Sequence, residues 1–238
     1  MKNIAFLLIL NIFALWSCTT DQDQEIGSSQ ETGTPVDVTR QILSLGDSYT
    51  IGQSVCDTCR FPEQLKSELR NTTDYTIDLN IIAQTGWTTT DLINSIDNQS
   101  LTSDYDLVTL LIGVNNQYQG LPFSVYESEF PELVETAITA SGGNKDKVIV
   151  ISIPDYAYTP FGQNSGNPET TSQEIDMYNT FAENYCNENN ITFVNITDIT
   201  REGLDNPSLV ATDGLHPSEL AYSRFVERIL PYALEKID

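Results

Sequence analysis

The stretch QILSLGDSY, residues 41–49, joins a short apolar run to a small polar turn. A run of this kind, bounded by turn residues, predicts a strand that is buried in a parallel sheet. Similar apolar runs recur along the chain and alternate with stretches of helical periodicity. This alternation predicts an α/β fold in which helices cover both faces of a parallel sheet. Ser48 then stands directly after the first strand.

The predicted elements form a three-layer α/β/α sandwich with a five-stranded parallel sheet. Residues 155–171 have little periodicity and carry several Gly, Pro and aromatic residues, which predicts a long loop over the substrate side. The domain is expected to span residues 39–238 as one unit. The expected strands are 41–45, 75–83, 106–112, 147–153 and 191–196, and the expected helices are 61–69, 88–96, 124–140, 174–189 and one that begins near Pro217.

Acidic residues dominate the charge of the chain, with 34 Asp and Glu against 11 Lys and Arg and a formal net charge of -23 at pH 7. Such a charge repels the phosphates of nucleic acids and the headgroups of anionic lipids. Nucleic acid is therefore not expected as a partner. The charge is better explained as a means of keeping an exposed protein soluble.

The N-terminus predicts export. Lys2 supplies a positive charge ahead of an apolar core, residues 4–15, which is too short to span a bilayer comfortably. Residues 1–17 are therefore expected to be a signal peptide that is removed from the mature protein.

The end of this segment, LWSC at residues 15–18, resembles a bacterial lipoprotein box. The resemblance implies that Cys18 becomes the lipidated first residue of the mature chain. Residues 19–38 are polar, acidic and rich in Ser, Thr and Gly, which predicts that residues 18–38 form a disordered acidic tether. A lipoprotein of the bacterial cell envelope, at the outer membrane or the surface, is expected, with membrane contact through this anchor only. Because Trp16 is bulky for such a box, the alternative is cleavage to a secreted, soluble form.

The cysteines favour a disulfide over a metal site. Cys56 and Cys59 have the spacing of a metal or redox pair, but zinc would need two more ligands, and only Cys186 and His216 remain, far apart in the sequence. A catalytic dithiol lacks any thioredoxin-like pattern. In an exported protein a local disulfide between Cys56 and Cys59 is expected, with Cys186 as a buried free thiol and no metal ion.

The only histidine of the chain, His216, follows Asp213 by three residues in the run DGLHP. A lone histidine is often only a surface residue. However, a serine hydroxyl needs a base with a pKa near 7 and a carboxylate that orients that base. Gly214 allows a tight turn that places the Asp213 carboxylate against the imidazole. Ser48, at the end of the first strand, is the candidate nucleophile.

Four sequence blocks, each after a predicted strand, extend this pattern. In open parallel sheets, ligands bind at the carboxyl ends of the strands, so the blocks are expected to share one edge. Together they resemble the SGNH, or GDSL-like, hydrolases over residues 40–236, which implies the flavodoxin-like SGNH hydrolase fold. The blocks are GDSY at 46–49, QTGW at 84–87, IGVNN at 112–116 and DGLHP at 213–217.

The resemblance implies a role for each block. Ser48 is the nucleophile, His216 the general base and then acid, and Asp213 the third member of the triad. The oxyanion hole combines the backbone N–H groups of Ser48 and Gly86 with the side-chain amide of Asn115. Acyl transfer needs only these groups of the protein, so no cofactor is expected.

Several block residues also have simpler interpretations. Gly86 could serve only a turn that needs positive φ, and Asn115 could cap the segment that follows it. Asp47 is interpreted as structural, supporting the turn at Ser48 through hydrogen bonds to the backbone. Family members often carry Asp where this chain has Asn116, so any support of the neighbouring loop by a charge would differ.

The expected reaction is hydrolysis of a carboxylic ester through an acyl-serine intermediate. Aromatic residues next to the blocks, namely Tyr49, Trp87, Tyr118 and Tyr156, could line a cleft for a sugar ring or a short acyl chain. The favoured hypothesis is O-deacetylation of an acetylated polysaccharide. The alternatives are a lysophospholipase or thioesterase for longer acyl chains, and a non-catalytic carbohydrate-binding lipoprotein on the same fold.

Overall fold

The computed structural model describes residues 38–238, so the predicted signal peptide, Cys18 and all of the predicted tether before Val38 lie outside the described residues. The described chain is built around one five-stranded parallel sheet, which confirms the predicted fold class. Its strands are β1 (Thr39–Gly46), β2 (Thr76–Ala83), β3 (Leu107–Leu111), β4 (Val148–Ile151) and β5 (Thr192–Val194).

The order of the strands across the sheet is β2-β1-β3-β4-β5. After β1 the chain first crosses to β2 on one side and then returns to β3 on the other, so the direction of winding reverses between β1 and β3. In doubly wound sheets this switch point leaves a crevice beyond the carboxyl ends of the strands, where ligands bind. The topology thus brings the end of β1, with Ser48, and the end of β3, with Asn115, to the two sides of such a crevice.

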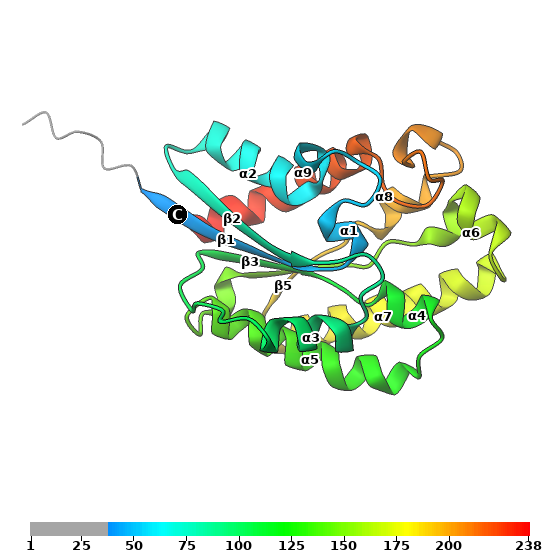
Figure 1. Cartoon of the computed structure of the whole chain (residues 1–238), viewed down its shortest axis with the longest axis horizontal. Coiled ribbons are helices and arrows are strands. Elements are labelled where there is room, and N and C mark those ends of the chain that lie inside the picture. Colours follow the sequence, from blue (N-terminus) through cyan, green and yellow to red (C-terminus); the bar gives the residue numbers. More distant parts are fainter. Residues whose placement is uncertain (1–37) are drawn as a thin grey trace, which may run out of the picture. The chain divides into compact units, whose positions relative to one another are not determined.

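Helices cover both faces of the sheet, as Figure 1 shows. Helices α2 and α9 pack together over one face, and α3, α5 and α7 cover the other. The helices are α1 (Ser48–Ile51), α2 (Phe61–Thr72), α3 (Thr89–Asp97), α4 (Val114–Tyr118), α5 (Phe123–Ala140), α6 (Pro160–Asn164), α7 (Pro168–Asn189), α8 (Thr197–Arg201) and α9 (Glu219–Ile237). Short 3-10 turns are η1 (Asp57–Cys59), η2 (Lys145–Lys147), η3 (Tyr156–Tyr158) and η4 (Pro207–Leu209).

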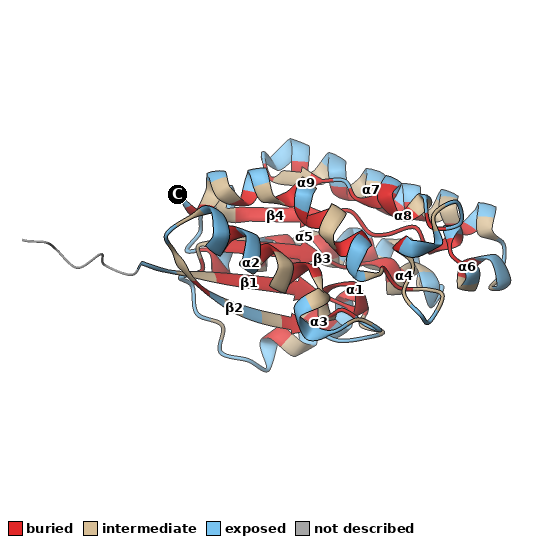
Figure 2. Ribbon diagram, turned by 90° about the horizontal axis from the view of Figure 1, so that it is seen from above, coloured by how far each residue is buried: buried red, intermediate tan, exposed pale blue. Residues whose placement is uncertain are grey.

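The central strands form the core of this domain. Every residue of β3 and of β4 is buried, because helices cover these strands from both sides. Strand β2 lies at the edge of the sheet and mixes buried with exposed residues. Figure 2 shows the buried strands between helices whose outer faces are exposed. Within residues 38–238, no helix combines the length and the apolar character needed to span a bilayer.

The prediction of one long loop over residues 155–171 was wrong in part. This segment contains η3, α6 and the first turn of α7. Both helices begin at a proline behind a capping side chain: Thr159 accepts a hydrogen bond from the N–H of Gly162, and Asn167 accepts from the N–H groups of Glu169 and Thr170. A Thr-Pro or Asn-Pro start is a recognised helix signal, but the Gly and Pro content of the segment concealed it. Helix α9 begins at Glu219, two residues after Pro217, and the side chain of Ser218 caps it.

Candidate active site

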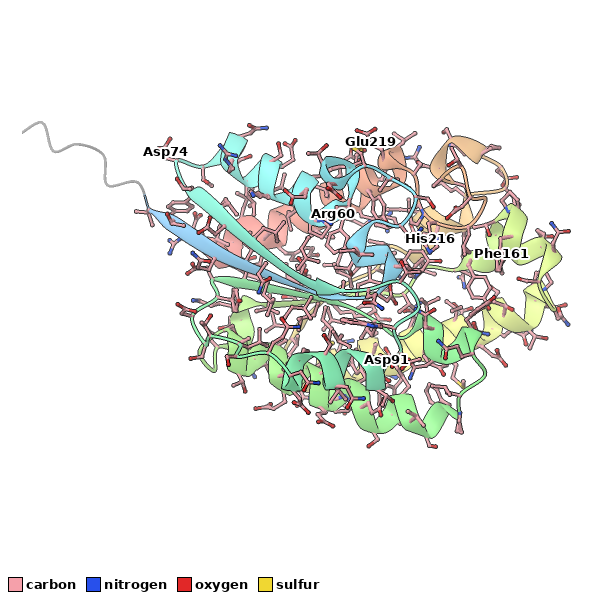
Figure 3. All side chains as sticks on the ribbon, in the orientation of Figure 1. Arg60, Asp74, Asp91, Phe161, His216 and Glu219 are labelled. Atoms are coloured by element: carbon pink, nitrogen blue, oxygen red, sulfur yellow. A yellow bond between two sulfur atoms is a disulfide. The ribbon has the colours of Figure 1, made fainter. Side chains whose placement is uncertain are left out.

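Residues from all four sequence blocks meet in one cleft of about 290 Å³ at the carboxyl edge of the sheet. Figure 3 shows His216 and Phe161 at this end of the molecule. The cleft therefore joins Ser48 to the predicted base and to both remaining members of the predicted oxyanion hole. Its lining residues are Ser48, Tyr49, Thr85, Gly86, Val114, Asn115, Tyr118, Tyr156, Phe161, Leu215 and His216.

Ser48 opens helix α1 immediately after β1. Gly46 makes this abrupt turn possible, since a Cβ at that position would lie 2.1 Å from Oγ1 of Thr50 and 2.4 Å from the carbonyl oxygen of Leu111. The N–H of Ser48 belongs to the first turn of a helix, where no intrahelical carbonyl is available to accept it. The strand-to-helix turn thus places Ser48 in the lining of the cleft, with a backbone N–H that no carbonyl of its own helix can accept.

The imidazole of His216 is held by Asp213. Its Nδ1 lies 2.6 Å from Oδ2 of the carboxylate, while Oδ1 accepts hydrogen bonds from the N–H groups of Leu215 (2.9 Å) and His216 (3.0 Å). Gly214 adopts φ +72°, the left-handed conformation that the turn requires. The ring of Tyr49 packs at 5.1 Å from the imidazole. The tight turn predicted from the DGLHP run is present, and it leaves Nε2 as the ring nitrogen for a reacting group.

Asp213 is ionised in this site. Partial burial alone would raise the pKa of its carboxyl, but hydrogen bonds from Ser54, His216 and two backbone N–H groups outweigh burial and lower the pKa to about 2. A carboxylate that accepts several hydrogen bonds is stabilised in its charged form. Asp213 therefore presents a fixed negative charge to the imidazole across the neutral pH range.

Gly86 and Asn115 line the same cleft as His216. Gly86 has φ +87° and its carbonyl accepts a hydrogen bond from Nε2 of Gln119 at 3.0 Å. The amide nitrogen of Asn115 donates one proton to the carbonyl of Trp87 at 3.0 Å, which fixes the orientation of the side chain and leaves its second proton for a ligand. Helix α4 is preceded by Gly113 at its cap position, so the alternative interpretation of Asn115 as a cap is wrong.

Asn116, next to Asn115 in the sequence, is hydrogen-bonded to Thr89. Its Oδ1 accepts from the N–H of Thr89 at 2.9 Å, and its Nδ2 donates to Oγ1 of Thr89 at 2.6 Å. The same Thr89 hydroxyl donates to the carboxylate of Glu129. An amide can both accept and donate here, whereas an ionised Asp could only accept and would place a second negative charge near Glu129. Asparagine at position 116, where family members often carry Asp, therefore suits the carboxylate of Glu129 nearby.

Residues 44–224 match the GDSL-like Lipase/Acylhydrolase family. The chain belongs to this family. Membership makes it an ester hydrolase of the GDSL type and confirms the family that the four blocks resemble.

Solved structures share the fold of this GDSL-like hydrolase. A lipase/acylhydrolase from Enterococcus faecalis has a TM-score of 0.65 and 21% identity, covering 84% of this chain and 97% of that chain. An acetylxylan esterase from Geobacillus stearothermophilus has a TM-score of 0.61 and 18% identity, covering 82% and 94%. The psychrotrophic esterase EstA from Pseudoalteromonas sp. has a TM-score of 0.62 and 17% identity, covering 82% and 97%. No curated protein matches this chain in sequence.

Asp47, directly before the serine, is fully buried and has the structural role predicted for it. Its Oδ1 accepts from the N–H of Tyr49 at 2.9 Å and so caps helix α1. Its Oδ2 is buried without a hydrogen-bond partner among the described residues. Burial raises the pKa of this carboxyl to about 7, although hydrogen bonds from the backbone N–H groups of Tyr49 and Asp47 oppose the rise.

This raised pKa makes stability depend on pH. From about pH 4 to about pH 7 the folded chain keeps the Asp47 proton that the unfolded chain has released, so the free energy of unfolding falls by up to about 4 kcal/mol as the pH rises. Asp47→Asn keeps the acceptor for Tyr49 and removes the titration. As the pH rises over this range, the free energy of unfolding of this variant, measured by urea denaturation, is expected to increase relative to that of the wild type. Parallel pH curves for the two proteins would contradict the assignment.

The disulfide and the free thiol are not in the lining of the cleft. Cys56 and Cys59 are joined in a disulfide in the loop that follows α1. Cys186 is a buried free thiol in α7, as predicted, and burial together with the nearby Glu183 raises its pKa to about 12. A thiol with so high a pKa is a poor nucleophile. Within residues 38–238, Ser48 is the nucleophile candidate that the cleft contains.

The structure adds residues that the sequence did not single out. Ser54 donates to Asp213, Thr85 donates to Gln53, and Phe161 joins the cleft from the segment predicted as a loop. Of the aromatic residues expected at the cleft, Tyr49, Tyr118 and Tyr156 line it, while Trp87 contributes its carbonyl to Asn115. Contacts between loops far apart in sequence leave no periodic signal, so the sequence does not indicate the contact of Ser54 with Asp213.

Proposed function

We propose that this GDSL-like hydrolase is a serine esterase that works through an acyl-enzyme at Ser48. The observation that carries the proposal is the placement of Ser48, Gly86, Asn115 and His216 around one cleft, with the Asp213 carboxylate 2.6 Å behind the imidazole. A nucleophile, a base oriented by a carboxylate, and convergent donors are the parts that acyl transfer needs.

The chemistry follows from these positions. Oγ of Ser48 attacks the ester carbonyl while Nε2 of His216 accepts its proton. The tetrahedral oxyanion is bound by the N–H groups of Ser48 and Gly86 and by the free amide proton of Asn115. The intermediate collapses when the protonated imidazole gives its proton to the leaving alcohol, which forms the acyl-serine. Water then attacks the acyl group while Nε2 of His216 accepts its proton. The second tetrahedral intermediate collapses as the bond to Oγ breaks and the imidazole returns the proton to Oγ, which releases the carboxylic acid and regenerates Ser48. Each oxyanion donor is worth about 3 kcal/mol of transition-state stabilisation.

The shape of the cleft favours a short acyl group on a neutral carbohydrate alcohol. The cleft of about 290 Å³ is small for a long acyl chain. One wall is aromatic. The ring centroid of Tyr118 lies 5.8 Å from that of Tyr156, which it meets edge-on, and 6.1 Å from that of Phe161, whose ring is tilted. The side chain of Tyr118 remains half-exposed, at 53% for the residue. An exposed ring beside the nucleophile offers a stacking surface for a sugar. The charge of -23 disfavours anionic lipid headgroups. An acetylated polysaccharide is therefore the proposed substrate class.

Chain-length preference tests this substrate class. The mature domain is expected to hydrolyse nitrophenyl acetate faster than nitrophenyl octanoate, with a ratio of kcat/KM of about tenfold or more, and to release acetate from acetylated xylan. Tyr118→Ala should raise KM for the polysaccharide by a larger factor than it changes kcat/KM for nitrophenyl acetate, because the polysaccharide offers sugar rings that stack on the exposed ring of Tyr118. A preference for octanoate would replace this proposal with the lysophospholipase or thioesterase alternative.

We further propose that the protein is exported and lipidated at Cys18. The disulfide between Cys56 and Cys59 supports an oxidising compartment, where such bonds persist. Metabolic labelling with a fatty acid is expected to mark the wild-type chain and not the Cys18→Ser variant. Recovery of an unlabelled wild-type chain from the medium would instead indicate the secreted, soluble form.

A further inference from the structure

The carboxylate of Asp213 has a hydrogen-bond donor that lies far from it in sequence. Oγ of Ser54 donates to Oδ2 of Asp213 at 2.6 Å, the same oxygen that meets Nδ1 of His216 at 2.6 Å. The other oxygen, Oδ1, is occupied by two backbone N–H groups of its own turn. Ser54 is therefore the contact from outside the DGLHP run that fixes the oxygen facing the imidazole.

The backbone of Ser54 adopts a conformation that is unusual for a residue with a side chain. Ser54 has φ +68°, in the left-handed region that residues with a side chain seldom occupy and that glycine enters freely. Strained residues of this kind cluster at functional sites, where the surrounding structure enforces them. Glycine would relieve the strain at position 54 but would remove the donor to Asp213. Serine at this position therefore accepts an unfavourable backbone conformation and provides the hydrogen bond to the carboxylate.

The loop that carries Ser54 is held at several points. The N–H of Gln53 donates to the carbonyl of Ser48 at 3.0 Å, and Oε1 of Gln53 accepts from the hydroxyl of Thr85 at 2.6 Å. Nη1 of Arg60 donates to the carbonyl of Ile51 at 3.3 Å. The disulfide between Cys56 and Cys59 closes the loop just beyond Ser54. Residues 51–60 therefore link the turn of the nucleophile to the carboxylate behind the base.

We propose that Ser54 is a positioning residue that acts on the reaction through Asp213. Its hydroxyl fixes the rotation of the carboxylate, so that Oδ2 stays in line with Nδ1 of His216 while the base exchanges protons with Ser48. This inference rests on the proposed acyl-enzyme function. Orientation of catalytic groups is a large part of enzymatic rate enhancement, and small displacements are costly.

Ser54→Gly separates positioning from a merely structural role. The substitution removes the hydroxyl and relieves the positive φ, so the melting temperature is expected to equal or exceed that of the wild type. The kcat for nitrophenyl acetate is expected to fall by about tenfold to a hundredfold, with KM unchanged. Asn190→Gly is the matched control, because Asn190 also has positive φ, at 55°, but caps the far end of α7. That variant should keep the wild-type kcat.

A double-mutant cycle with Asp213→Asn completes the test. If Ser54 acts through Asp213, Ser54→Gly has no further effect on kcat once the carboxylate is gone. Wild-type kcat in Ser54→Gly, or an equal fold-loss in both backgrounds, would overturn the inference. Failure of the underlying function is recognised separately: a fluorophosphonate probe would then fail to label Ser48 in the wild-type protein, whatever the behaviour of the Ser54 variants.

Discussion

Ser48→Ala is expected to lower kcat for ester hydrolysis by about ten-thousandfold or more while leaving the fold intact. The hydroxyl is the attacking group of the proposed mechanism, and the free thiol of Cys186 lies buried in α7, outside the lining of the cleft. Alanine keeps the backbone N–H of residue 48 and favours the helix that begins there. The measurement is steady-state hydrolysis of nitrophenyl acetate beside a thermal melt.

Ser67→Ala provides the matched control for this variant. Ser67 is an exposed helical serine of α2, and its loss is expected to change neither kcat nor stability. A fluorophosphonate probe should label the wild type and the Ser67→Ala variant at Ser48, and should not label Ser48→Ala. Substantial turnover in folded Ser48→Ala would exclude Ser48 as the nucleophile and would require another attacking group in the cleft.

The residues at the carboxyl edge of the sheet were predictable because the candidate site residues come directly after strands in the sequence. A buried parallel strand is a continuous apolar run, and the first polar residues after it must lie at the rim, as Ser48 and Asn115 do. The spacing of Asp213 and His216 also specified a local turn, and Gly214 in the left-handed conformation provides it. These features are local in sequence, which is why they can be predicted from the sequence.

The contacts that bring loops together were not predictable in this way. The hydrogen bond between Ser54 and Asp213 joins residues 159 positions apart, and nothing in the residues around Ser54 marks a positive φ. The short helix α6 was missed for a different reason: its Gly and Pro residues resemble those of a loop and concealed the helix start at Thr159 and Pro160. The roles of Cys18 and of the first 37 residues remain predictions from the sequence.

Asp213→Asn is expected to lower kcat by about a thousandfold to ten-thousandfold, although the substitution changes a single atom of the side chain. Oδ1 of the asparagine can still accept from the N–H groups of Leu215 and His216, so the turn is preserved. Its amide nitrogen, however, replaces Oδ2 and donates toward Nδ1 of His216. The imidazole must then carry its proton on Nε2, where it cannot accept the proton of Ser48.

Asp205→Asn is the control for the loss of one negative charge, because Asp205 is exposed in the same connection between β5 and α9. It is expected to retain the wild-type kcat. The two variants are compared by steady-state kinetics with nitrophenyl acetate and by the rate of fluorophosphonate labelling, which should also fall in Asp213→Asn because labelling needs the same base. If Asp213→Asn kept kcat within about tenfold of the wild type, while Ser48→Ala lost activity, the tautomer of His216 would have to be set by contacts other than Asp213. The hydrogen bond from Ser54 would then have no route to the reaction.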